Sequence, residues 1–400
     1  MKLNYLSFAI PFFVGFMVLE YYLSGKKKSL IFRFEEAIAN LSVGLTERFT
    51  DLITGGLFYF FFKWLYENYA IFNISTAWYN WVALFLVTDL VYYWYHRFGH
   101  KVNILWSVHV VHHQSEDYNY TTSVRVTLFQ AVGRSLFWSV LPILGFSPAM
   151  VTTFLLIHGA YPFFTHTQLI GKLGILEYFL VTPSHHRVHH SSNPEYLDKN
   201  YGDILIIWDK MFGTFAKETV APVYGITKPL NSYSFLWQMF HFQLELLYAL
   251  KKAKGFLPKL KVIFGKPDDI DPRIRSVLEK KLNINQGTKA SPINHRFILL
   301  QSFFNMCFVF FVILFSHYQT ALQITIAGVF LLFSMVNTGA ILERKQKIFY
   351  IEFIRFLLLS SYIYLIFPNY FTLMSLLSFN LLLLLFSKTI TVRYDRWLFS

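Results

Sequence analysis

Histidines with metal-ligand spacing are the residues of this chain best suited to chemistry. Eleven of the fourteen histidines lie between His96 and His190, and nine of these eleven form three clusters. The clusters are HRFGH (His96, His100), HVVHH (His109, His112, His113) and HHRVHH (His185, His186, His189, His190). Imidazole is the commonest side-chain metal ligand, and residues three and four apart share one face of a helix. Each cluster can therefore direct two or three ring nitrogens to one point, which indicates a polyhistidine metal centre.

Nine histidines are the expected ligands of this centre. Each HxxHH run supplies three nitrogens if it is helical, and HRFGH adds two. His166 is the favoured ninth ligand, because it follows a broken apolar stretch and returns to the side of the other clusters. The expected ligands are His96, His100, His109, His112, His113, His166, His186, His189 and His190.

The remaining histidines are expected to have other roles. His185 is one residue out of phase with the HxxHH face, so we expect it beside the metals or as an alternate ligand. His158 lies deeper in an apolar run and is expected to be a core histidine bonded to a backbone carbonyl. Three histidines stand alone in the sequence and are expected to be structural: His241, His295 and His317.

Asp89 is the expected partner of a ligand histidine. It lies seven residues before His96, which places both on one face of a helix inside an apolar run. A buried carboxylate is costly unless it is paired. Asp89 can accept the second ring N–H of a ligand histidine and so fix its tautomer. The alternative is a helix-capping or interhelical contact.

The number of candidate ligands favours two metal ions. Imidazole binds zinc, copper, nickel and iron, and intrinsic affinity favours zinc or copper over Fe(II). Structural zinc, however, needs only four ligands and no vacant position. A dinuclear centre in a lipid-facing enzyme points to oxygen activation by iron. The residues alone leave the identity of the metal open.

The composition predicts an all-α integral membrane protein. Hydrophobic residues make up 54% of the chain and charged residues only 15%, whereas soluble domains are about one quarter charged. Seven apolar runs are long enough to cross a bilayer: Leu3–Leu23, Leu52–Phe72, Ala77–Tyr95, Phe297–Ser316, Ala321–Leu342, Ile348–Phe367 and Phe371–Phe386. A further stretch, Leu136–Phe164, contains Pro142, Gly145 and Pro148 and predicts a re-entrant helical hairpin.

Basic residues predict how this multi-span bundle is oriented. Lysines and arginines follow the first, fifth and seventh runs, whereas the opposite loops carry none. The positive-inside rule then places the basic loops in the cytoplasm. If Leu136–Phe164 turns back without crossing, all the histidine clusters lie in one cytoplasmic helical cap.

The net charge of +13 needs no nucleic-acid partner, because much of it lies beside these runs and in the segment Lys251–Lys266. That segment is either an amphipathic stretch on an anionic leaflet or a solvated basic linker. The single cysteine, Cys307, excludes a disulfide framework and a thiolate metal site. Leu3–Leu23 is expected to be an anchor rather than a signal peptide.

Four regions follow from these features. Residues 1–95 hold the N-terminal spans, and residues 96–266 hold the histidine clusters and the re-entrant hairpin. Residues 267–296 form a polar linker, and residues 297–400 form a C-terminal region of four membrane helices.

At its histidine clusters the chain resembles the fatty acid hydroxylase/sterol desaturase superfamily, whose members are membrane enzymes with a histidine-ligated di-iron site. The order HxxxH, HxxHH, HxxHH is that of the superfamily. Within it, the chain most resembles the ether-lipid-cleaving branch, the alkylglycerol monooxygenases. This likeness rests on Asp89–Arg125, Thr182–Phe215, Val223–Tyr233 and the four C-terminal hydrophobic segments.

The resemblance implies that the nine expected ligands hold two Fe²⁺ ions, with Asn200 and Asp209 as supporting residues. Many sterol desaturases carry a further histidine soon after the second cluster, where this chain has TTSVR with Arg125. This difference favours the ether-lipid branch. That branch has a glutamate directly after the first cluster, where this chain has Lys101.

The activity implied is O2-dependent hydroxylation of a membrane lipid at the carbon beside an ether oxygen. The sequence offers no second domain for haem, flavin or nicotinamide, so the electrons must come from a soluble tetrahydropterin or a separate electron-transfer protein. The alternative enzyme is a fatty acid, sterol or carotenoid-type hydroxylase or desaturase on the same scaffold. A metal-binding receptor or transporter would need ionisable residues in several spans, and the C-terminal segments offer almost none.

Overall fold

The chain folds into helices, as its composition predicts. The computed structural model describes residues 2–27, 31–284 and 293–399, and these residues contain no strand, only two isolated β-bridges. The α-helices are α1 (Ala9–Lys26), α2 (Phe34–Tyr69), α3 (Trp78–Lys101), α4 (Asn103–His109), α5 (Tyr120–Ser123), α6 (Gln130–Trp138), α7 (Val140–Leu144), α8 (Pro148–Thr165), α9 (Pro183–His189), α10 (Ile207–Met211), α11 (Phe235–Lys252), α12 (Phe256–Phe264), α13 (Arg273–Lys281), α14 (His295–Leu314), α15 (Ala321–Leu342), α16 (Phe349–Ile366), α17 (Tyr370–Leu385) and α18 (Ser387–Leu398).

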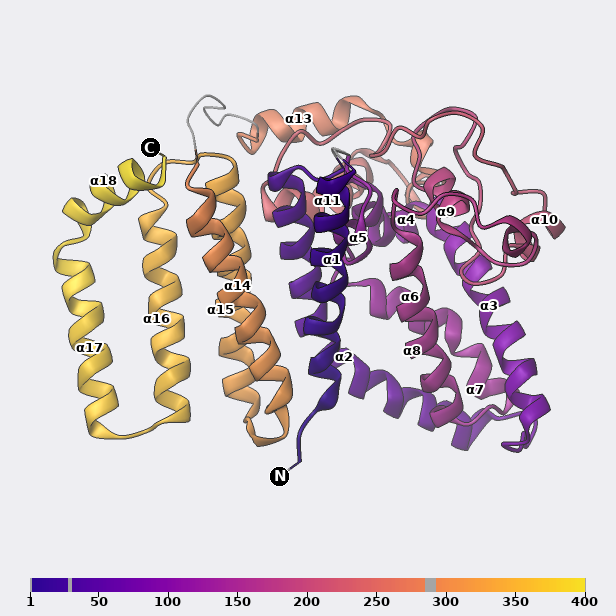
Figure 1. Cartoon of the computed structure of the whole chain (residues 1–400), viewed down its shortest axis with the longest axis horizontal. Coiled ribbons are helices and arrows are strands. Elements are labelled where there is room, and N and C mark those ends of the chain that lie inside the picture. Colours follow the sequence, from indigo (N-terminus) through magenta and orange to yellow (C-terminus); the bar gives the residue numbers. More distant parts are fainter. Residues whose placement is uncertain (1, 28–30, 285–292, 400) are drawn as a thin grey trace.

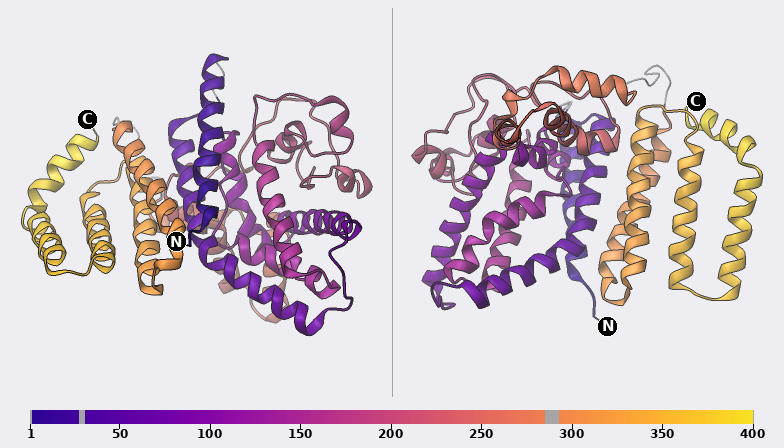
Figure 2. Two further views of the ribbon diagram at one scale, coloured as in Figure 1. Left: turned by 60° about the horizontal axis from the view of Figure 1, so that its bottom comes forward. Right: turned by 180° about the vertical axis from the view of Figure 1, so that it is seen from behind.

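The helices form two groups that stand side by side (Figure 1). Helices α1, α2, α3, α6 and α8 make up one group, and α14 to α17 make up the other. The view from behind in Figure 2 shows the same division, with α11 and α13 lying across one end of the molecule. Helix α2 packs against both α14 and α15 and so joins the two groups.

Fewer helices than the seven predicted pass as membrane spans on length and composition. Among the described residues four pass, at Tyr5–Lys26, His295–Leu314, Ala321–Leu342 and Phe349–Ile366. Helices α17 and α18 add a fifth if this pair, bent by 79°, counts as one span. The predicted spans Leu52–Phe72 and Ala77–Tyr95 lie mostly in α2 and α3, which do not pass this test. The chain remains an integral membrane protein.

The predicted break in Leu136–Phe164 is confirmed and lies at Gly145. Helix α7 ends there, and α8 begins after Ser147, whose side chain caps the new helix. Gly145 has a φ of 110°, and a Cβ at this position would lie 2.0 Å from the carbonyl oxygen of Phe72. Only glycine meets both conditions, so this residue fixes the turn between α7 and α8.

A layer of buried side chains packs together the parts of this unit that lie away from the histidines. Leu84 of α3, Trp138 of α6, Leu141 of α7 and Met150 of α8 pack into one core. Helix α3 thereby packs against α8, and the two helices contact α4 and α9, respectively.

The basic segment and the predicted linker are largely helical. Segment 251–266 contains α12, whose Phe256 and Leu257 are exposed while Val262 packs against the core. The predicted linker 267–296 contains α13, and its residues 285–292 lie outside the described residues. Lys28, one of the basic residues after the first span, also lies outside them.

Candidate metal centre

The nine expected ligands come together in two groups, each of which could hold a metal ion. Within each group the ligand atoms all lie within 4.8 Å of one another. The first group consists of His96, His100, His109, His113 and His189, and the second of His112, His166, His186 and His190. The nine histidines therefore form two adjacent sites, with five nitrogens in the first and four in the second.

The two HxxHH motifs are each divided between the sites, so the expectation that one motif serves one point is wrong. Helix α4 ends at His109, and residues Val110–His113 continue as a tighter 3₁₀ turn. His112 belongs to the second site, although it lies only three residues after His109 of the first. In the third cluster His189 belongs to the first site and its neighbour His190 to the second.

Backbone carbonyls orient four of these imidazoles. His96 Nδ1 lies 2.8 Å from the oxygen of Tyr201, and His189 Nδ1 lies 3.0 Å from that of Lys199. His112 Nδ1 lies 3.2 Å from the oxygen of Arg125, and His166 Nδ1 lies 2.6 Å from that of Pro162. A carbonyl only accepts, so each Nδ1 is the donor and each Nε2 carries a lone pair.

These lone pairs face one another with no proton to share, and this arrangement fits a cation. The Nε2 atoms of His166 and His112, both of which carry a lone pair, lie 3.2 Å apart. Burial lowers the pKa of His112 to about 3 and that of His189 to about 4, so both rings are neutral at pH 7. Converging neutral imidazoles suit a first-row metal ion in each group.

Asn200 and Asp209 support the segment that supplies two of the carbonyls. The Asp209 carboxylate accepts the N–H groups of Tyr201 and Gly202, both at 2.8 Å, and the hydroxyl of Thr214 at 2.6 Å. Asn200 adopts a φ of 55° and donates to the carbonyl oxygens of His185 and Ala216. Both side chains therefore act on His96 and His189 through the backbone of residues 199–202.

The expected bond from a ligand histidine to Asp89 is not formed among the described residues. Asp89 instead accepts the N–H groups of Ile204 at 3.0 Å and Leu205 at 3.1 Å and the indole N–H of Trp208 at 2.8 Å. The backbone carbonyl of Tyr201 takes the place that Asp89 was expected to fill. The sequence shows which residues carry a carboxylate, whereas every residue has a backbone carbonyl. The sequence therefore gave no indication that the carbonyl of Tyr201 would accept this bond.

His158 is buried as expected, but its partner is a carboxylate rather than a carbonyl. Its Nδ1 atom bonds to Asp203 and lies 3.8 Å from an oxygen of Asp89. Sequence reasoning missed Asp203, and its place two residues after Tyr201 gave no signal of this pairing. His185 belongs to neither metal group, because its Nδ1 atom faces the carbonyl oxygen of Leu180 at 3.2 Å.

Aromatic rings and one ion pair complete the surroundings. The Tyr118 ring lies 5.4 Å from that of His166, and the Trp106 ring lies 5.1 Å from that of His100. Lys101 forms an ion pair with Asp198, which also accepts the hydroxyl of Tyr201 at 2.8 Å. Lys101 therefore contacts the loop behind the metal groups rather than the imidazoles.

The chain is similar to known proteins. The family model described as fatty acid hydroxylase matches residues 81–214. The human alkylglycerol monooxygenase is 33% identical over 371 residues, which cover 89% of this chain and 81% of the human protein. The Danio rerio alkylglycerol monooxygenase is 32% identical over 375 residues, with the same two shares. The ornithine lipid hydroxylase OlsE of Rhizobium tropici is 29% identical over 134 residues, covering 32% of this chain and 40% of that protein. No solved structure matches the chain.

Proposed function

The chain belongs to the alkylglycerol monooxygenase family of fatty acid hydroxylases, and from this premise we propose that it is a di-iron enzyme that cleaves ether lipids. The coarser assignment, a membrane-bound lipid hydroxylase, follows from the family itself. The finer one is that the enzyme uses O2 to hydroxylate the carbon beside the ether oxygen of an alkylglycerol.

The observation that carries the proposal is the division of nine imidazoles, seven of them buried and two partly buried, into two adjacent sites. We propose that the five histidines of the first group and the four of the second hold one Fe²⁺ ion each. When bound, the two ions supply O2 activation for insertion into an unactivated C–H bond. A site for zinc alone needs neither nine ligands nor a second ion.

The protein contributes position, protection from water and a defined histidine tautomer. The carbonyl oxygens of Tyr201, Arg125, Pro162 and Lys199 keep each Nε2 atom free for a metal. The rings of Tyr118 and Trp106 cover the imidazoles, so the reacting carbon meets a site shielded from water.

The overall reaction balances with an external reductant. One oxygen atom of O2 enters the C–H bond, and the other leaves as water with two electrons and two protons from the reductant. The hydroxylated ether is a hemiacetal, which breaks its C–O bond to give a fatty aldehyde and a glycerol hydroxyl. We propose a tetrahydropterin or a separate electron-transfer protein as the source of the electrons.

We further propose that the histidine sites face the cytoplasm. Helix α3 ends in the first cluster, and α15 ends before Arg344, Lys345 and Lys347. Figure 1 shows α9, near the histidines, at the end of the molecule where α13 and α18 lie. The basic residues and the metal sites thus share one side, which the positive-inside rule assigns to the cytoplasm.

A fatty acid or other lipid hydroxylase that leaves its substrate intact is the second candidate. The similarity to an ornithine lipid hydroxylase over 134 residues supports it. Lys101 also supports the second candidate, because the ether-lipid branch has a glutamate at this position.

Aldehyde release tests the proposal and separates the two candidates. Membranes containing the chain are incubated with a 1-O-alkylglycerol and O2, with and without tetrahydrobiopterin, and the fatty aldehyde is measured. The His112→Ala, His113→Ala double variant serves as the inactive control. We expect aldehyde release that needs O2 and both histidines. Hydroxylated or desaturated lipid with an intact ether bond would move the assignment to the second candidate.

A further inference from the structure

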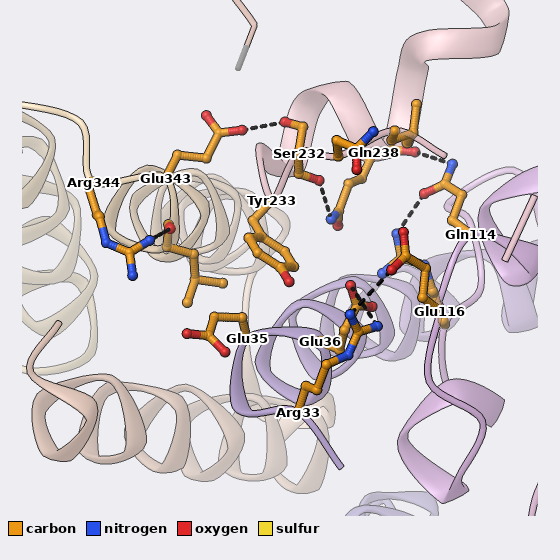
Figure 3. A pocket seen from close by; sticks show the side chains of 14 residues that line it. Arg33, Glu35, Glu36, Gln114, Glu116, Ser232, Tyr233, Gln238, Glu343 and Arg344 are labelled. Carbon is orange, nitrogen blue, oxygen red and sulfur yellow. Dashed lines mark hydrogen bonds and ion pairs between the residues drawn. The ribbon is translucent and has the colours of Figure 1, made fainter. Parts of the chain in front are cut away.

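The segment Lys251–Lys266 carries positive charge with no negative charge among its own residues. It contains six lysines and no aspartate or glutamate, and acidic residues follow only after the end of α12. The pocket in Figure 3 differs, because it gathers charges of both signs. There the Arg33 guanidinium lies 3.2 Å from the Glu116 carboxylate and 3.8 Å from that of Glu36. The lysines of the segment thus form a basic surface rather than a set of ion pairs.

The apolar residues of α12 form one face of the helix, and a lysine flanks this face on each side. At about 100° per residue, five apolar residues share about 120° of the helix surface: Phe256, Leu257, Leu260, Ile263 and Phe264. Lys259 lies beyond one edge of this face and Lys261 beyond the other. From such edges a lysine side chain reaches polar headgroups while its methylene groups cover apolar surface. This pattern is typical of a helix that lies in the surface of a membrane.

The apolar face of α12 points away from the protein. Phe256, Leu257 and Phe264 are 73%, 74% and 63% exposed. The residue that packs against the core is Val262, on the opposite side of the helix. Contact between these large apolar side chains and water is unfavourable, so an apolar medium outside the chain is needed to cover them.

Helix α13, the next α-helix along the chain, shows the arrangement expected of a helix in water. It buries Ile274 and Leu278 and exposes Arg273 and Lys280. The two helices follow one another in the sequence but present opposite kinds of face to their surroundings. The outward apolar face is therefore a property of α12 rather than of this whole region.

Two hydrogen bonds place α12 beside the end of α3. Helix α3 ends at Lys101, shortly after its apolar run Ala77–Tyr95 stops. The backbone N–H of Asn103 donates to the carbonyl oxygen of Gly265 at 2.8 Å, and its side-chain amide donates to that of Val262 at 2.9 Å. The end of an apolar run is expected at the boundary between lipid and water. Helix α12 therefore lies at the level of this boundary.

We propose that α12 binds the anionic phospholipid surface of the membrane on the side of the histidine sites. Phe256, Leu257 and Phe264 lie among the acyl chains, and the lysines lie at the level of the phosphates. A second copy of this face is a poorer partner, because two helices flanked only by lysines repel each other. Asn103 begins α4, which ends at His109, so the leaflet also fixes the level of the first metal site.

A fluorophore at Leu257 tests whether this face lies in lipid. In a Cys307→Ser background, Leu257→Cys is labelled with a nitrobenzoxadiazole dye. The iron-loaded full chain is then placed in nanodiscs of phosphatidylcholine and phosphatidylserine. We expect quenching of the dye by spin-labelled acyl chains. Quenching by aqueous iodide should be at least about fivefold weaker than at a position in water, because the bilayer excludes the ion.

Val277→Cys in the same background is the matched control. Val277 is also apolar and is 45% exposed, but it lies on the water-facing side of α13. A dye at this position should be quenched by iodide and not by the acyl chains. The iron content of each labelled protein shows whether it has folded.

Headgroup preference tests the role of the lysines. Quenching at Leu257 is compared between spin-labelled phosphatidylserine and spin-labelled phosphatidylcholine at equal content. We expect phosphatidylserine to quench at least about twofold more strongly. The Lys259→Gln, Lys261→Gln double variant should reduce this preference while the dye stays in lipid, because the apolar face is unchanged.

Three results would overturn the inference. Iodide quenching as strong at Leu257 as at Val277 would place the face in water. Protection of Leu257 from both quenchers would mean that protein, such as a second copy, covers it. Equal quenching by the two headgroups in the parent chain would refute the anionic surface. Aldehyde release is measured separately, so failure of the proposed function leaves these results unchanged.

Discussion

Neighbouring histidines of one motif lie in different metal sites. His109 and His113 belong to the first group, while His112 between them belongs to the second. His189 and His190 are divided in the same way. The motifs therefore connect the sites, because the backbone of each HxxHH run holds both groups at once. A distortion in one run displaces ligands of both ions.

Single substitutions in one motif should therefore remove different ions. We predict that His109→Asn empties the first site and His112→Asn the second, so that each variant keeps about one of two metal ions per chain. Mass spectrometry of the purified protein measures the metal content. Both variants should be inactive, since the reaction needs both sites. Loss of both ions from either variant, with the fold retained, would contradict two separable sites.

Asp209 should affect the metals without touching them. Its two oxygens accept the N–H groups of Tyr201 and Gly202, and Tyr201 in turn holds His96. Asp209→Asn loses one of these acceptors, so the carbonyl of Tyr201 is less well placed. We predict metal affinity about 10- to 100-fold weaker, measured by competition with a chelator. Asp271→Asn at an exposed site is the control, and equal affinity in both variants would refute this role.

At the scale of the element, one glycine fixes the hairpin that delivers His166. Helix α8 starts after the turn at Gly145 and ends at Thr165, so the direction of α8 sets where His166 lies. The sequence showed this break, because proline and glycine interrupt an apolar run at that place. The turn is thus a local feature with a distant effect on the metal centre.

We predict that Gly145→Ala destabilises the protein by at least about 1 kcal/mol, since the residue has a positive φ and its new Cβ would meet the carbonyl of Phe72. Thermal unfolding in detergent, followed by size-exclusion chromatography, measures the change. Gly171→Ala is the control, because a Cβ there would have no neighbour within 4 Å. Equal stability of the two variants would show that the turn tolerates a side chain.

The sequence predicted the helices and histidines of the site better than the contacts between residues that are far apart in the chain. The helical class, the break at Gly145 and the convergence of nine histidines follow from composition and spacing, which are local properties. The 3₁₀ turn at Val110–His113 could not be predicted, because its sequence also suits an α-helix. The pairing of His158 with Asp203 joins residues far apart in the chain, and spacing gives no information about such contacts.

At the scale of the whole molecule, the basic helix ends and the histidine sites lie on one side. Labelling of single cysteines in a Cys307→Ser background tests this topology. We predict that Lys347→Cys reacts from the cytoplasm, whereas Asn73→Cys and Asn369→Cys react from the opposite side. These two asparagines lie in loops without lysine or arginine. Labelling of Lys347→Cys and Asn369→Cys from the same side would contradict the orientation.

The identity of the product tests the central claim most directly. Purified chain with two bound irons is supplied with a 1-O-alkylglycerol, a reductant and O2, and the products are identified by mass spectrometry. The account predicts equal amounts of fatty aldehyde and glycerol, none without O2, and none from the His112→Asn variant. An intact ether lipid carrying a hydroxyl or double bond elsewhere, or cleavage that continues without O2, would contradict it.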